Sequence, residues 1–149
     1  MTIENERLLL RPVVEADDEA IFEYSREPNV GVNAGWKPHE TIDESREFMK
    51  YVLLGVDGAF AIVLKSEHKL IGTIGLMPDA KRENPNARTI GYSISEKYWG
   101  RGLMTEAVGA VVRYAFEQQH AELVSAYCYP HNERSKGVLL KNGFTYEGR

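Results

Sequence analysis

Two glycines flank an arginine at Gly100, Arg101 and Gly102, between an apolar segment and the start of a helical pattern. Glycine lets a backbone turn tightly and brings its N–H groups close to a ligand. The first turn of a helix adds unpaired N–H donors and a partial positive charge, here over Leu103 to Thr105. The stretch therefore predicts a cradle for an anionic group. A plain strand-to-helix turn is the alternative, and the glycine pair alone favours that alternative.

Two other phosphate-binding motifs do not match. The sequence contains no GxxxxGK[ST] element, and Thr105 stands where the third glycine of GxGxxG would be. Both a P-loop and a dinucleotide fingerprint are therefore excluded at this turn.

A second polar constellation lies near the C-terminus, at Asn132, Ser135 and Lys141. Here the pattern predicts a short helix over 132–141 that is stopped by Asn142 and Gly143. Taken alone, the constellation is explained by helix capping, with Asn132 as N-cap and Gly143 as C-cap.

Together the two segments resemble the GNAT acetyltransferase superfamily. Residues 99–107 read W-G-R-G-L-M-T-E-A, similar to the loop that holds the acyl-CoA pyrophosphate, and Asn132, Ser135 and L-K-N-G-F at 140–144 match a second signature. The general pattern [QR]-x-x-G-x-[GA] is met only at Gly102. The W-G-x-G form with a following Glu-Ala pair resembles the RimJ/RimL branch, which is similar to the N-terminal acetyltransferases of ribosomal proteins.

The resemblance implies that acetyl-CoA is the cosubstrate, without a metal. It would lie in a splay between the strands predicted at 88–95 and 123–129. The Ile94 backbone would hold the acetyl carbonyl, Asn132 would touch the pantetheine arm, and Ser135 would donate a proton to the CoA sulfur. Ser135 and Asn132 are thus the implied catalytic residues. The implied cofactor-binding residues are Ile94, Gly100, Arg101, Gly102, Leu103, Met104, Thr105, Asn132 and Lys141.

By the same resemblance, an amine attacks the thioester directly. A free α-amino group, with a pKa of about 8, is partly neutral at neutral pH, whereas a lysine with a pKa of about 10.4 is not. A protein N-terminus therefore needs little help from a base, although a small amine is an equally open acceptor. Tyr24 and Trp36 either line the acceptor pocket, which this superfamily builds partly in that region, or are simply buried.

A catalytically inactive CoA-binding module is the alternative. Many members of the superfamily have a proton-donating tyrosine where this chain has Leu139. Rim-type members use a glutamate beyond G-F-x-x-E-G, and the sequence ends at Arg149. Other carboxylates that could act as a base are Glu106, Asp79 and Glu83. The helix dipole explains Glu106 more simply, and solvation is the default for the other two.

Composition limits the other classes of function. Lys and Arg number 18 against 22 Asp and Glu, and this net charge of -4 gives no field for binding nucleic acid. The single cysteine, Cys128, forms no internal disulfide, and neither an apolar stretch long enough to span a membrane nor a signal sequence is evident. The histidines have no metal-ligand spacing. We expect a cytoplasmic monomer or homodimer without a metal.

The elements that must position these residues follow from periodicity and turn signals. We expect strands over 6–12, 59–65, 69–77, 88–95, 123–129 and from 144, and helices over 17–27, 41–55, 104–119 and 132–141. This order predicts an α/β (α+β) fold with a central mixed, mostly antiparallel sheet flanked by helices. With 149 residues, we expect one acetyltransferase domain over 1–149 that lacks its last C-terminal strand or strands.

Overall fold

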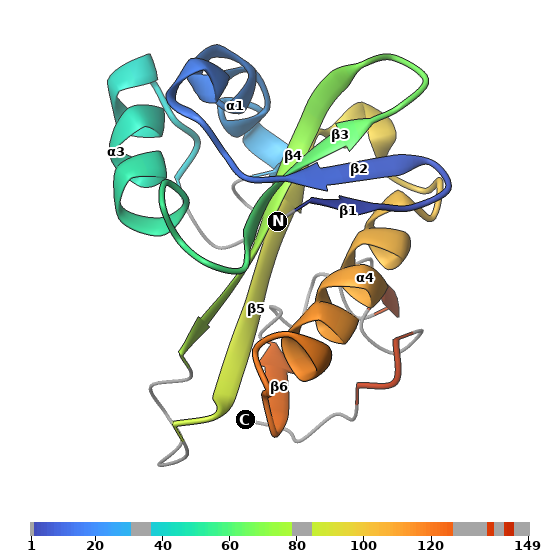
Figure 1. Cartoon of the computed structure of the whole chain (residues 1–149). Coiled ribbons are helices and arrows are strands. Elements are labelled where there is room, and N and C mark those ends of the chain that lie inside the picture. The colour runs from blue at the N-terminus through green and yellow to red at the C-terminus, as the bar shows by residue number, and fades with distance from the viewer. Residues whose placement is uncertain (1, 31–36, 79–84, 127–136, 139–141, 145–149) are drawn as a thin grey trace.

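The computed structural model describes residues 2–30, 37–78, 85–126, 137–138 and 142–144. Within them, six strands form one sheet in the order β1-β2-β3-β4-β5-β6 (Figure 1). The strands are β1 (Ile3–Glu4), β2 (Leu8–Arg11), β3 (Ala59–Leu64), β4 (Lys69–Pro78), β5 (Ala87–Ile94) and β6 (Leu123–Ala126). Neighbours from β1 to β5 are antiparallel, and β6 joins β5 in parallel. The predicted mixed, mostly antiparallel sheet is confirmed.

Helices cover both faces of this sheet (Figure 1). Helices α1 (Asp18–Ser25) and α3 (Ile42–Val52) lie on one face, and α4 (Leu103–Glu117) crosses the other. Two short 3-10 helices, η1 (Glu15–Asp17) and η2 (Glu96–Tyr98), precede α1 and α4. In the described residues, no helix is long and apolar enough to cross a membrane.

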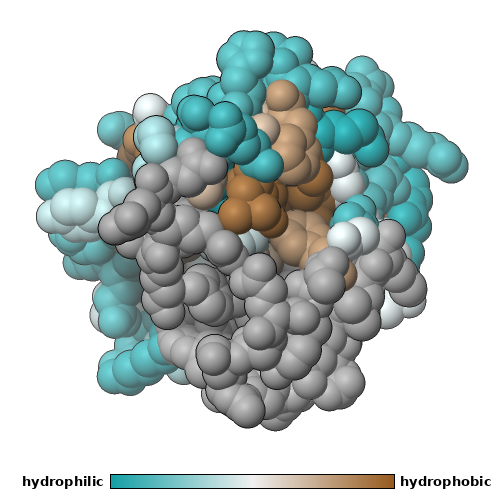
Figure 2. All heavy atoms as spheres, turned by 90° about the horizontal axis from the view of Figure 1, so that it is seen from below, coloured by the Kyte–Doolittle hydropathy of each residue, from teal (hydrophilic) through white to brown (hydrophobic). Residues whose placement is uncertain are grey.

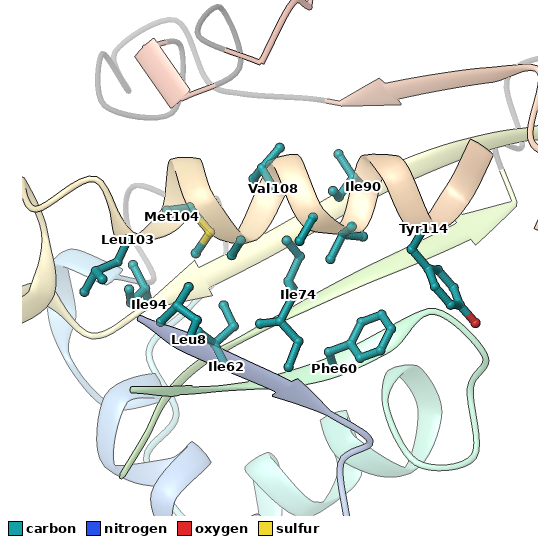
Figure 3. Close-up of a cluster of buried hydrophobic side chains, with 14 of the residues drawn as sticks. Leu8, Phe60, Ile62, Ile74, Ile90, Ile94, Leu103, Met104, Val108 and Tyr114 are labelled. Carbon is teal, nitrogen blue, oxygen red and sulfur yellow. The ribbon is translucent and has the colours of Figure 1, made fainter. Parts of the chain in front are cut away.

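The pleat of the strands divides the buried side chains into two clusters. On β3, Phe60 and Ile62 face α4, whereas Ala59 and Ala61 face α1 and α3. Successive side chains of a strand point to opposite faces, so a strand covered on both sides is apolar throughout. The cluster beneath α4 contains Leu8, Ile74, Ile90, Val108 and Tyr114 among others (Figure 3). It fixes α4 against the middle of the sheet.

Figure 2 looks onto the lower end of Figure 1 and shows apolar residues gathered near the centre of this face, bordered on one side by polar residues.

A local signal marks the start of α3. Thr41 caps α3 through a reciprocal capping box: its hydroxyl accepts from the Glu44 N–H at 3.4 Å, and its own N–H donates to the Glu44 carboxylate at 3.2 Å. The apolar residues of α4 recur at helical spacing and are buried, including Ala107, Val111 and Ala115.

The structure differs from the sequence prediction in several places. Strand β1 was not predicted, because two residues carry no readable period. Helix α4 begins one residue early, at Leu103. Residues 28–30 are helical, although the predicted helix ends at residue 27, because proline ends one helix but also suits the first turn of the next. Phe144, the expected start of a final strand, has no regular secondary structure.

Candidate functional site

The turn from η2 into α4 has two glycines in the left-handed backbone region. Gly100 has φ of 79° and Gly102 has φ of 76°, a conformation that only glycine adopts at little cost. Gly102 is the N-cap of α4 and has no side chain to accept from the N–H groups of the helix. The N-cap residue of α4 therefore makes no side-chain hydrogen bond to the first turn of the helix.

The backbone donors of the first turn of α4 remain available. The Glu106 N–H donates to the Gly102 carbonyl at 3.1 Å, and the described residues show no acceptor for the N–H groups of Leu103, Met104 and Thr105. The side chains of Leu103 and Met104 are buried in the cluster under α4 (Figure 3). Main-chain donors at the positive end of a helix are what the predicted anion cradle requires.

Strand β5 leads into this turn and ends at the second candidate donor, Ile94. The Ser95 N–H donates to the carbonyl of Ile71, a residue of the neighbouring strand β4, at 2.8 Å. Because backbone groups alternate in direction along an antiparallel strand, the N–H and C=O of Ile94 point away from β4, toward the β6 side. Pairing with β6 is described only up to Ile90 opposite Ala126, so Ile94 lies beyond it.

Trp99 links the end of β5 to the glycine turn, a role that the sequence did not indicate. Its indole Nε1–H donates to the Ile94 carbonyl at 3.0 Å, and its ring packs against both buried clusters. The carbonyl of Ile94 thus accepts from Trp99, and the part of the chain that the structure describes shows no acceptor for the Ile94 N–H.

Arg101 lies over the Tyr98 ring rather than extending freely into solvent. Its guanidinium carbon is 5.3 Å from the ring centroid, and Nη2 donates to the Lys97 carbonyl at 3.3 Å. Burial and the adjacent Glu67 carboxylate, which accepts from the phenol at 2.6 Å, raise the pKa of Tyr98 to about 12. Arg101 and Lys97 place two positive charges beside the turn.

Glu106 is held by an ion pair that the sequence did not reveal. Arg7 Nε donates to one carboxylate oxygen at 2.9 Å, and the Arg7 backbone N–H donates to the other at 3.1 Å. A carboxylate so occupied is a poor candidate for a general base. No sequence signal links the two residues, because they are 99 positions apart.

Asn142 connects the C-terminal signature to α4. Its side-chain amide donates to the carbonyl of Val138 at 2.9 Å and to that of Thr105 at 3.2 Å. On α4, a Cβ added at Gly109 would lie 2.9 Å from the Asn142 Oδ1, so this glycine makes room for the close contact. Asn142 is therefore anchored to the helix that begins at the glycine turn.

Several predicted residues lie outside the described part of the chain. Among the site candidates these are Asn132, Ser135 and Lys141, together with Trp36, Asp79, Glu83 and Leu139. Tyr24 is described and is 2% exposed, with its hydroxyl 2.7 Å from the Thr73 Oγ1, so it is a core residue. In the described residues, no group of three His, Cys, Asp or Glu side chains is arranged to hold a metal ion.

Known proteins with similar sequences and structures show the family to which this chain belongs. A family model described as an acetyltransferase (GNAT) domain matches residues 7–145. The Bacillus licheniformis protein named uncharacterized N-acetyltransferase p20 is 30% identical over 99% of this chain and 84% of its own length. An acetyltransferase of the GNAT family from Bacillus anthracis superposes with a TM-score of 0.87 at 29% identity, over 99% of this chain and 86% of that one. The chain therefore belongs to the GNAT acetyltransferase family.

Within that family, the protein is an N-acetyltransferase, an enzyme of the acyltransferase class. A third similar protein is the [ribosomal protein uS5]-alanine N-acetyltransferase of Escherichia coli, which is 37% identical over 60% of this chain and 45% of its own length. The RimJ/RimL-like resemblance seen in the motifs is thus confirmed. GNAT acetyltransferases use acetyl-CoA as the acetyl donor.

Proposed function

We propose that the protein binds acetyl-CoA with its pyrophosphate at the glycine turn and transfers the acetyl group to a primary amine. The observation that carries the proposal is the pair of left-handed glycines at 100 and 102, followed at the start of α4 by N–H groups that have no acceptor among the described residues. Gly100, Arg101, Gly102, Leu103, Met104 and Thr105 form this binding segment. Arg101 and Lys97 add positive charge beside it.

Ile94 supplies the polarising donor for the reaction. Its N–H points to the open side of β5, and a hydrogen bond to the acetyl carbonyl would strengthen as negative charge develops on that oxygen. Trp99 holds the peptide carbonyl of the same residue. The donor is therefore placed by the sheet and by the indole before the substrate arrives.

The amine attacks the thioester carbon directly. The carbonyl becomes a tetrahedral oxyanion, the C–S bond then breaks, the amine proton leaves to solvent, and the CoA thiolate is protonated. Ser135 is our candidate donor to that sulfur, with Asn132 on the pantetheine arm and Lys141 near a CoA phosphate, as in the resemblance.

A protein N-terminus is the acceptor that we favour. The similarity to a uS5-alanine N-acetyltransferase supports it, and an α-amine with a pKa of about 8 needs little base assistance. This suits a site in which Glu106 is occupied by Arg7. A small amine is the second acceptor class.

We infer a reducing, cytoplasmic location from the single cysteine.

The test is acetyl-CoA turnover, followed as free thiol, with peptides that begin with alanine or serine, with N-terminally blocked versions of the same peptides, and with polyamines. We expect thiol release with the free peptides and a mass increase of one acetyl group at their N-termini. Turnover only with polyamines would replace the N-terminal acceptor by a small amine. CoA binding without turnover on any acceptor would leave only the binding module.

A further inference from the structure

The turn between β1 and β2 lies against the glycine turn that precedes α4. Arg7 Nη1 donates to the Arg101 carbonyl at 2.8 Å, and Arg7 Nε and backbone N–H both donate to Glu106. Asn5 adds a side-chain donor to the Glu106 carbonyl at 3.4 Å. One arginine thus joins the middle of the glycine turn to the first turn of the helix.

The opposite side of the β1-β2 turn is fixed to the sheet. Lys65, directly after β3, donates its backbone N–H to the Arg7 carbonyl at 3.0 Å. The Lys65 Nζ donates to the Asn5 carbonyl at 2.6 Å and pairs with Glu4 at 2.7 Å. Arg7 therefore extends from a backbone segment that is itself held in place.

We propose that Arg7 is a positioning residue that holds the 100–105 segment in its CoA-binding shape. The inference rests on the proposed function. Two glycines bring conformational freedom and no side chains, so an ordered turn needs contacts from outside it. The Arg7 guanidinium supplies them on both sides of Gly102, at Arg101 and at Glu106. Fixing these donors beforehand lowers the ordering cost of binding.

Compensation of the Glu106 charge is a second way in which Arg7 would favour CoA binding. Glu106 places a carboxylate in the first turn of the helix whose N-terminus would receive a pyrophosphate, and like charges repel there. The Glu106 side chain is 17% exposed, so water screens it only partly, and the Arg7 ion pair at 2.9 Å compensates its charge. Loss of Arg7 would leave that repulsion uncompensated.

The test compares Arg7→Met with Arg46→Met, a matched control. Arg46 also pairs with a carboxylate, Asp18, at 2.9 Å, and is 55% exposed against 44% for Arg7. We expect Arg7→Met to raise the CoA dissociation constant by calorimetry, and the acetyl-CoA KM, about tenfold, the effect of losing one charged contact. The kcat at saturating acetyl-CoA should stay unchanged, and Arg46→Met should leave both constants unchanged.

Arg7→Lys and Glu106→Gln keep the proposal testable if Arg7→Met folds poorly. A lysine keeps the charge but cannot reach Glu106 and the Arg101 carbonyl together, so partial rescue is expected. Glu106→Gln removes the repulsion, and the double variant with Arg7→Met should bind CoA better than Arg7→Met alone. Hydrogen exchange of CoA-free protein should be faster at residues 103–105 in Arg7→Met only.

The outcomes separate the two proposals. Wild-type protein that fails to bind CoA would overturn the proposed function and this inference with it. Wild-type binding with unchanged CoA affinity and exchange in Arg7→Met, or equal losses in Arg7→Met and Arg46→Met, would overturn the inference alone. A loss confined to kcat would equally contradict a positioning role.

Discussion

Gly102 and Gly55 adopt nearly the same left-handed backbone conformation, with φ of 76° and 72°, in two different settings. A Cβ at Gly102 would meet Arg7 Nη2 at 3.5 Å, an ordinary contact, and a Cβ at Gly55 would meet no described atom within 4 Å. Alanine at either position therefore carries mainly the conformational cost of about 1–2 kcal/mol. The two residues form a matched pair, because only Gly102 lies in the candidate site.

We expect Gly102→Ala and Gly55→Ala to lower the free energy of unfolding by similar amounts, about 1–2 kcal/mol in denaturant titrations. Only Gly102→Ala should weaken CoA binding, by about tenfold, because relief of the strain displaces donors that must be accurately placed. Equal CoA affinities in the two variants would remove Gly102 from the binding site.

A second prediction concerns Ser135 as the proton donor to the CoA sulfur. If its hydroxyl protonates the leaving thiolate, Ser135→Ala should lower kcat by about 100-fold, the usual contribution of a general acid, with little change in acetyl-CoA affinity. Ser66→Ala, in the exposed turn between β3 and β4, is the control. Steady-state kinetics with calorimetry measure both quantities, and an unchanged kcat would exclude Ser135 as the donor.

At the scale of elements, the contact between α4 and the C-terminal signature depends on the absence of a side chain at Gly109. An added Cβ there would lie 2.9 Å from Asn142 Oδ1, whereas a Cβ at the helical Gly137 meets no described atom within 4 Å. Glycine inside a helix normally costs about 1 kcal/mol relative to alanine. The two glycines should therefore respond differently to the same substitution.

We expect Gly137→Ala to raise the free energy of unfolding by up to about 1 kcal/mol. Gly109→Ala should show no such gain, because the Asn142 amide must move and its hydrogen bond to Thr105 is strained. Chemical denaturation of both variants measures the difference. Equal stabilisation would mean that Asn142 does not depend on the space at Gly109.

Elements with local signals were predictable. The capping box at Thr41 and Glu44 marks α3, and the apolar stripe of α4 recurs at helical spacing. Strand β1 and the helical residues 28–30 were not predictable. A two-residue strand forms only because β2 is there to pair with it. Pro28 ends one helix and also lies in the first turn of the next. Long periodic segments determine their own structure, whereas short ones depend on neighbours.

The stability of the whole molecule should depend on the charge of His39, which joins α1 to α3. Its backbone N–H donates to the Ser25 carbonyl at 3.0 Å, and its ring Nδ1 lies 2.7 Å from the Oγ of the buried Ser45. Burial lowers the pKa of His39, while the charge of Glu44 acts in the opposite direction. The folded protein thus takes up this proton less readily than the unfolded chain.

Proton linkage gives the direction in which the free energy of unfolding changes with pH. The stability that neutral His39 contributes is fully present above the unfolded pKa of about 6.5 and is lost as pH falls through it toward the lower folded pKa. We expect the free energy of unfolding to decrease between about pH 7 and about pH 5, and less so in His39→Gln. Urea titrations across this range measure the slope, and equal slopes would contradict the assignment.

The sequence by itself determined the backbone chemistry of the site. The glycines at 100 and 102 and the apolar stripe after them are local features, so their turn and helix could be deduced from neighbouring residues alone. Only the tertiary structure placed Arg7 on Glu106, Trp99 on the Ile94 carbonyl and Asn142 against Gly109. These contacts depend on strand order and on which face α4 covers, and no local pattern encodes a pairing across 99 positions.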